Sequence, residues 1–197
     1  MEPARKGPEK KETGLLTLFC DVSFCPETGA AGYGAWYRTD AMERGVFFGG
    51  QVPVRCHSSN DGEFWGLVLA LRETLARLRG AAPDAVVMQC DNIAALGWVR
   101  AFRENCKAVG EHHGTHPIPE MRTYPSSMAD AVAVLRTLAP GTPIWLKHVK
   151  GHDTKSKASR SWVNKMCDRE ARQLACFTIR FAAPHAPVAS PLSRSGV

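Results

Sequence analysis

The chain has 197 residues, of which 44% are hydrophobic and 22% are charged, as in ordinary soluble globular proteins. This length suits one domain of about 150 residues with tails, which can bury a core without disulfides or a structural metal. The net charge of +6 favours a polyanionic partner. The seven cysteines form no CxxC pair and no run of 18 apolar residues occurs, so we expect a cytoplasmic protein without a membrane span.

Two segments that are predicted to be disordered flank the predicted domain. Residues 1–13 mix basic and acidic residues with prolines and predict a disordered tail, because they cannot bury apolar surface. Residues 177–197 contain three prolines and many small residues, which predicts a second disordered tail. The folded domain is therefore expected to span residues 14–176, and we expect it to act as a monomer.

Three strands and a helix are predicted in the first half of this domain. Strand patterns cover residues 15–23, 32–38 and 45–54, and the turn-rich segment PETGAAG joins the first two as a hairpin. Apolar residues then recur at helical spacing over residues 60–79, up to Gly80. The pattern predicts an antiparallel meander followed by a helix.

The second half alternates strands and helices. Residues 85–90 form a continuous apolar run, typical of a buried parallel strand, and a helix follows through residue 102. Helices are also predicted at 128–138 and 159–174, with a strand at 143–149 between them. This order predicts an α/β fold with a five-stranded mixed sheet, an antiparallel meander plus two parallel strands, and helices on both faces.

Four acidic residues fall where this fold would gather them at one edge of the sheet. Asp21 and Asp91 end apolar strands, Glu63 lies in the first turn of the helix at 60–79, and Asp168 lies in the last helix. Carboxylates this close would repel one another without cations, and Mg²⁺ prefers oxygen ligands. The pattern therefore predicts a site in which two Mg²⁺ ions, or Mn²⁺ as a substitute, promote hydrolysis of a phosphodiester.

Three of these acids also have ordinary structural interpretations. Glu63 could complete a capping box that begins at Asn60, and Asp91 could cap the helix that follows it. Asp168 could pair with Arg172 one helical turn later. Their joint occurrence in this order favours the metal site.

The chain resembles type 1 ribonucleases H, which cut the RNA strand of RNA–DNA hybrids, over residues 15–175. The resemblance implies a ribonuclease H-like fold, a Mg²⁺-dependent endoribonuclease activity, and the four acids as catalytic metal ligands. The residues that carry it are Asp21 with Gly32-Tyr33-Gly34, Asn60 with Glu63, the strand-ending Asp91, and Asn164 with Cys167-Asp168.

The resemblance implies further catalytic and substrate-binding residues. Val149-Lys150-Gly151-His152 matches the family's catalytic loop, so His152 would assist proton transfer or product release. The implied contacts to the 2′-hydroxyls and phosphates of the hybrid are Ser59, Asn60, Lys150, Lys155, Lys157 and Asn164. From residue 147 to 165, six basic residues stand against a single acid, which suits such contacts.

Two other functions stay open. Glu27 and Ile93 differ from the residues typical of the family, and they favour a nuclease of the same fold that acts on DNA or DNA junctions. The long segment between His152 and Asp168 favours a nucleic-acid-binding module with weak catalysis.

Overall fold

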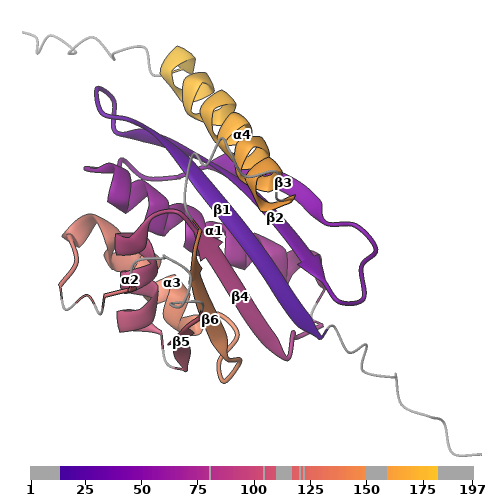
Figure 1. The fold of residues 1–197 in the computed structure, drawn as a ribbon. Helices are drawn as coiled ribbons and strands as arrows, with labels where there is room; N and C mark the ends of the chain where they lie inside the picture. Colours follow the sequence, from indigo (N-terminus) through magenta and orange to yellow (C-terminus); the bar gives the residue numbers. More distant parts are fainter. Residues whose placement is uncertain are drawn as a thin grey trace, which may run out of the picture.

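The strands form a single mixed sheet in the order β3-β2-β1-β4-β6-β5 (Figure 1). The computed structural model describes residues 14–181 except for 80, 104, 110–116, 120, 122 and 150–158. The strands are β1 (Leu15–Cys25), β2 (Ala30–Thr39), β3 (Val46–Gln51), β4 (Ala85–Cys90), β5 (Cys106–Ala108) and β6 (Ile144–His148).

The strand directions match the predicted α/β fold. β1, β2 and β3 pair as an antiparallel meander, and β4 and β6 run parallel to β1. A sixth strand, β5, pairs in parallel with β6, so the prediction of five strands is one too few. β5 has only 3 residues, which is too short to show the period-two pattern of a strand.

Within the described residues, four α-helices and a short 3₁₀ helix connect or follow the strands. They are α1 (Ser59–Arg77), α2 (Ile93–Phe102), η1 (Ser126–Met128), α3 (Ala129–Thr137) and α4 (Ser159–Phe181). α4 continues to Phe181 instead of ending at residue 174, because the sequence offers no proline or glycine before Pro184. The two predicted tails, residues 1–13 and the part of the second one after residue 181, lie outside the described residues.

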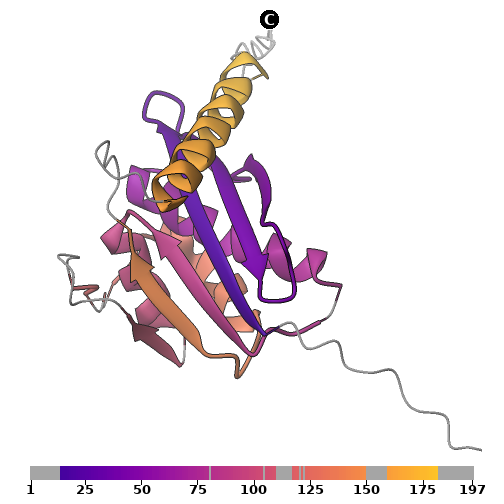
Figure 2. The same ribbon diagram turned by 45° about the vertical axis from the view of Figure 1, so that its right-hand side comes forward.

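The helices lie on both faces of the sheet. α1, α2 and α3 cover one face and α4 crosses the other, as Figures 1 and 2 show. The alternation of side chains along β1 explains this: Leu16 and Leu18 join the main core under α1, whereas Phe19 points to the α4 face. Each fully buried leucine stabilises the fold by roughly 1.5–3 kcal/mol.

α4 covers only part of its face. It packs on β1, β2 and β3 near the carboxyl end of β1, and Figure 2 shows the neighbouring strands β4 and β6 with no helix drawn across them on this side. No helix in the described part of the chain is both long and apolar enough to cross a membrane.

Candidate active site

Asp21 lies in the second half of β1, next to α4, and the strand continues past it to Cys25, so the prediction that Asp21 ends the strand is wrong. It pairs across the ladder with Gly34 of β2, and only 8% of the residue is exposed. The backbone N–H of Val22 donates a 2.9 Å hydrogen bond to Asp21 Oδ1. The carboxylate is therefore held in one orientation between the sheet and α4.

Glu63 is buried in the first turns of α1, and a different acid caps this helix. Ser58 is the N-cap residue: its Oγ accepts a hydrogen bond from the backbone N–H of Asp61, and the Asp61 carboxylate accepts one from the His57 N–H. The capping interpretation of Glu63 is therefore wrong. Its side chain instead reaches the end of β4, where Cys90 Sγ lies 3.8 Å from Glu63 Oε2.

Two glycines of α1, Gly62 and Gly66, let this helix approach β1 closely. A β-carbon at Gly66 would overlap Cγ2 of Val22, and one at Gly62 would lie 3.3 Å from Val22 Cγ1. Val22 follows Asp21 directly, so the space that its side chain needs comes from the two helical glycines. The contact fixes α1, and with it Glu63, against the strand that carries Asp21.

Asp91 follows β4 at its carboxyl end. The N-cap of α2 is Asn92, whose Oδ1 accepts a 2.9 Å hydrogen bond from Ala95 N–H, so the capping interpretation of Asp91 is wrong as well. The ring Nε2 of His148, at the end of β6, lies 3.0 Å from the Asp91 carbonyl oxygen. One ligand atom each from Glu63, Cys90 and Asp91 lie within 4.8 Å of one another.

Asp168 reaches the same region from α4. A β-carbon at Gly34 would overlap the carbonyl oxygen of Cys167, so this glycine permits α4 to lie directly on β2. Because Gly34 pairs with Asp21, the close approach brings Asp168 beside the first carboxylate. Asp168 also forms the expected ion pair with Arg172, at 2.7 Å, but the arginine side chain is 63% exposed, so the pair adds little stability.

The charges at this edge of the sheet repel one another. Burial and then the Asp91 carboxylate raise the pKa of Asp21 from 3.8 to about 7, and Asp168 adds to this shift. Burial and then the Asp21 and Asp91 carboxylates raise the pKa of Glu63 well above its ordinary range. Asp21 therefore lies close enough to interact electrostatically with each of the other three predicted acids.

The residues fit a hard divalent cation. Asp21 and Glu63 are buried and form no ion pair within the described ranges, which leaves their charge to be neutralised by a proton or a cation. Burial and then Glu63 raise the pKa of the Cys90 thiol, which disfavours the thiolate form that binds a soft metal. The remaining donors are carboxylate oxygens, which suit Mg²⁺ and Mn²⁺.

We expect the Asp21→Asn variant to be more stable than the wild type without metal at about pH 8. The pKa of Asp21 is about 7 in the folded protein against 3.8 ordinarily. Stability is therefore lost as the pH rises from about 4 to about 7, and at about pH 8 the ionised carboxylate opposes folding. Asparagine keeps the Val22 contact without the charge, and the gain is at most about 4 kcal/mol. Thermal unfolding in EDTA measures it.

The pH dependence and a control variant test this cause. The difference in melting temperature should shrink towards about pH 4, where the wild-type carboxyl binds a proton in the folded state. Asp84→Asn makes the same chemical change at an exposed position and should leave the melting temperature unchanged. An Asp21→Asn variant that melts at or below the wild-type temperature in EDTA would contradict the predicted repulsion.

The predicted substrate-binding residues lie partly inside the described structure. Ser59 and Asn60 start α1, and Asn60 Oδ1 accepts a 2.8 Å hydrogen bond from Asn92 Nδ2. Asn164 lies one turn before Asp168 and is buried, with no hydrogen-bond partner for its Oδ1 among the described residues. The predictions for His152, Lys150, Lys155 and Lys157 fall outside the described residues.

Three residues with a role in the geometry of the site were not predicted. Asp61 is 1% exposed and accepts a 2.7 Å hydrogen bond from Ser127 Oγ, which ties α1 to η1. The spacing of Ser58 and Asp61 is a capping signal that could have identified this acid. No local signal could have identified Asn92 as the partner of Asn60, or His148 as the partner of the Asp91 carbonyl, because each pair comes from separate segments.

Comparison with known proteins supports the fold and gives no match in sequence. No protein-family model matches the chain, and no curated protein matches it. Among solved structures, the N-terminal RNase H domain of a Mycobacterium tuberculosis protein, solved as a fusion with maltose-binding protein, has a TM-score of 0.57 at 15% identity and covers 86% of this chain and 99% of that one.

Two further solved structures agree with this result. RNase H1 from the halophilic archaeon Halobacterium salinarum has a TM-score of 0.55 at 15% identity, covering 82% of this chain and 97% of that one. LC11-RNase H1, solved in complex with an RNA/DNA hybrid, has a TM-score of 0.56 at 10% identity, covering 83% and 99%. The chain therefore has the fold of ribonuclease H domains.

Proposed function

We propose that this protein is a metal-dependent endonuclease that hydrolyses the RNA strand of RNA–DNA hybrids. The observation that carries the proposal is the convergence of Asp21, Glu63, Asp91 and Asp168 at one edge of the sheet, where burial and mutual repulsion raise the pKa of Asp21 and Glu63. Such a cluster of carboxylates destabilises the fold unless a bound ligand neutralises its charge, and divalent cations fit this role.

The four carboxylates are the proposed cation ligands. Two Mg²⁺ ions bound there would activate a water molecule and stabilise the leaving oxygen of an in-line displacement, and Mn²⁺ is the expected substitute. The protein itself holds its ligands in place before the substrate arrives: Val22 N–H orients Asp21, and the His148 ring contacts the Asp91 carbonyl. Groups that are already oriented need little reorganisation during the reaction.

Four observations support an RNA–DNA hybrid as the proposed substrate. The net charge of +6 suits a polyanion, and the similar LC11-RNase H1 binds an RNA/DNA hybrid. Ser59 and Asn60 lie in the first turn of α1, one turn before Glu63, where they can contact the 2′-hydroxyls that distinguish RNA from DNA. The buried amide of Asn164, one turn from Asp168, offers a further polar contact.

The basic segment from residue 147 to 165 has a proposed role in binding and proton transfer. Lys150, Lys155 and Lys157 would contact phosphates, which gives affinity without sequence preference. His152 would transfer a proton to the leaving group, for which its ordinary pKa of about 6.5 is suited.

Cleavage assays on a panel of substrates test this proposal. With Mg²⁺ we expect cuts in the RNA strand of an end-labelled hybrid, none in duplex DNA or duplex RNA, and loss of all cutting when EDTA removes the cation. Cutting of duplex DNA or a DNA junction in preference to the hybrid would replace this function with the DNA-nuclease alternative. Tight hybrid binding without cutting in Mg²⁺ or Mn²⁺ would identify a binding module instead.

A further inference from the structure

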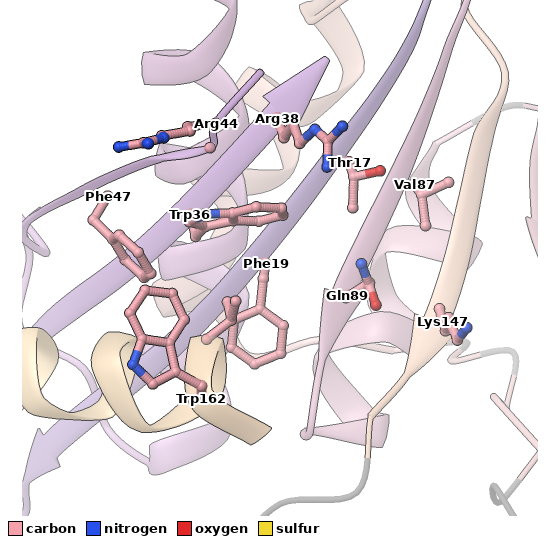
Figure 3. Close-up of a pocket in the computed structure, with 12 residues that line it drawn as sticks. Thr17, Phe19, Trp36, Arg38, Arg44, Phe47, Val87, Gln89, Lys147 and Trp162 are labelled. Carbon is pink, nitrogen blue, oxygen red and sulfur yellow. The ribbon is translucent and has the colours of Figure 1, made fainter. Parts of the chain in front are cut away.

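A pocket opens on the α4 face of the sheet, in the region that α4 leaves uncovered (Figure 3). Its volume is about 790 Å³, within the range of sites that bind organic ligands. The four carboxylates do not line it. The pocket is therefore separate from the proposed active site, and the inference drawn from it goes beyond the proposed function.

The floor of the pocket is one row of residues that pair directly across five strands. In each adjacent pair of strands the two row residues are register partners, so their side chains stand side by side on one face. We call this the cross-sheet row, and it consists of Phe47, Trp36, Phe19, Gln89 and Lys147. Three aromatic rings thus lie beside one polar and one basic side chain.

Trp162 of α4 forms the aromatic wall above this row. Its ring stands edge-on to the Phe47 ring, with centroids 5.3 Å apart and planes at 86°, and 57% of the residue is exposed. Figure 3 shows Trp162, Phe47, Trp36 and Phe19 arranged around the same space, with Phe47 on the left and Phe19 on the right. An exposed indole held by such a contact offers a flat face on which another ring can stack.

The charged groups around the pocket are basic. Arg38, Arg44 and Lys147 line it, and none of its described lining residues is acidic. Arg38 Nε donates a 3.1 Å hydrogen bond to the Met42 carbonyl, which steadies this side chain at the rim, and Arg44 is exposed beside it. The site is therefore complementary to a ligand that combines negative charge with flat aromatic rings.

We propose that this surface binds single-stranded nucleic acid. Unpaired bases expose faces that stack on aromatic side chains, and their phosphates suit arginine and lysine. A duplex hides its base faces, so it cannot use Trp162 and Trp36 in this way. An apolar peptide would leave the arginine side chains without a counter-charge, which makes it the poorer match.

The pocket leads directly towards the proposed active site. Asp21 is two residues beyond Phe19 on β1, so these two side chains point to the same face about 7 Å apart. Asp91 follows the carboxyl end of β4, two residues after Gln89. A nucleic-acid strand that leaves the carboxylates can therefore continue over the cross-sheet row. This surface would hold a single-stranded extension of the substrate or product.

Binding of a fluorescein-labelled oligothymidylate, measured by anisotropy in EDTA, tests this inference. EDTA prevents cleavage, so the result is independent of whether the protein is a nuclease. We expect Trp162→Ala to weaken binding about tenfold, the loss typical of one stacked base. We expect Arg44→Ala to weaken binding and to lower the slope of log affinity against log salt by about 0.7, the value for one lost phosphate contact.

Two variants on the opposite side of the molecule serve as controls. Tyr124→Ala removes an exposed aromatic ring that packs on Phe102 of α2, and Arg72→Ala removes an exposed charge from α1, so both should bind as the wild type does. Circular dichroism checks that each variant is folded, and the exposed Arg44 position keeps the test valid if Trp162→Ala unfolds.

Three results would overturn the inference. The first is wild-type affinity in both Trp162→Ala and Arg44→Ala, and the second is no binding of the oligothymidylate by the wild type. The third is a wild-type dimer in light scattering that Trp162→Ala converts to a monomer, which would show that a second copy of the chain covers the pocket. Cleavage of a blunt-ended hybrid should be equal in the wild type and in Arg44→Ala.

Discussion

Replacing Asp91 with asparagine is expected to lower the rate of hybrid cleavage by about a thousandfold or more while the protein stays folded and binds the hybrid. Asp91 lies beside Glu63 at the carboxyl end of β4, where its carboxylate is a proposed cation ligand. Stabilisation of the transition-state charge at such a site is worth several kcal/mol, and each 1.4 kcal/mol is a factor of ten in rate. Single-turnover cleavage in Mg²⁺ measures the loss.

Hybrid binding separates this effect from a structural one. Asparagine has nearly the same shape, and the contact of His148 involves the backbone carbonyl of residue 91, which the substitution keeps. One negative charge less near the phosphates should leave affinity in EDTA equal to or slightly above the wild-type value. Asp84→Asn is the matched control at an exposed site. Cleavage by Asp91→Asn at the wild-type rate would contradict the proposed site.

Replacing Gly34 with alanine is expected to destabilise the protein by about 1–3 kcal/mol and to reduce cleavage at least tenfold. The new β-carbon would overlap the carbonyl oxygen of Cys167, and a backbone atom cannot move aside by changing rotamer. α4 must therefore shift away from β2, which takes Asp168 away from Asp21. Thermal unfolding and cleavage, assayed at a temperature where the variant is folded, measure the two effects.

Gly50→Ala is the comparison that isolates the position of α4. A β-carbon at Gly50 would meet only the end of the Tyr33 ring, at 2.9 Å, so the disturbance involves a side chain rather than α4. We expect this variant to cleave the hybrid at close to the wild-type rate. If Gly34→Ala lost stability and kept full activity, the position of Asp168 would not depend on this glycine.

The sequence allowed most of the fold to be predicted because its elements have strong periodic patterns. The meander and α1 are defined by local alternation or helical spacing, and the parallel strand β4 by a continuous apolar run. The observed pairing of these strands agrees with the prediction. β5 was missed because its pairing with β6 depends on a partner that lies far away in the sequence. α4 was predicted too short because the prolines and small residues of 177–197 indicate a disordered tail, although the first of these prolines is Pro184.

The candidate site was predictable in its residue types but not in its contacts. The sequence alone could not exclude that Glu63 and Asp91 serve as helix caps. The structure excludes it, because Ser58 and Asn92 are the N-cap residues of α1 and α2. The cross-sheet row could not be predicted at all, because it depends on the register of four separate strand pairs. Register follows from turns and packing together rather than from any single segment.

The contact between Val22 and Gly66 has a consequence for how such a protein can diverge. The valine side chain on β1 occupies the space that a side chain at Gly66 of α1 would need. A larger residue at position 66 therefore requires a smaller one at position 22. In a chain with glycine at 22, alanine at 66 would lose its severest overlap and would next meet Tyr33 Cβ at 3.2 Å and Cys20 Sγ at 3.3 Å. Paired exchanges of this kind conserve the backbone while they remove sequence identity, which fits a fold shared with proteins only 10% and 15% identical.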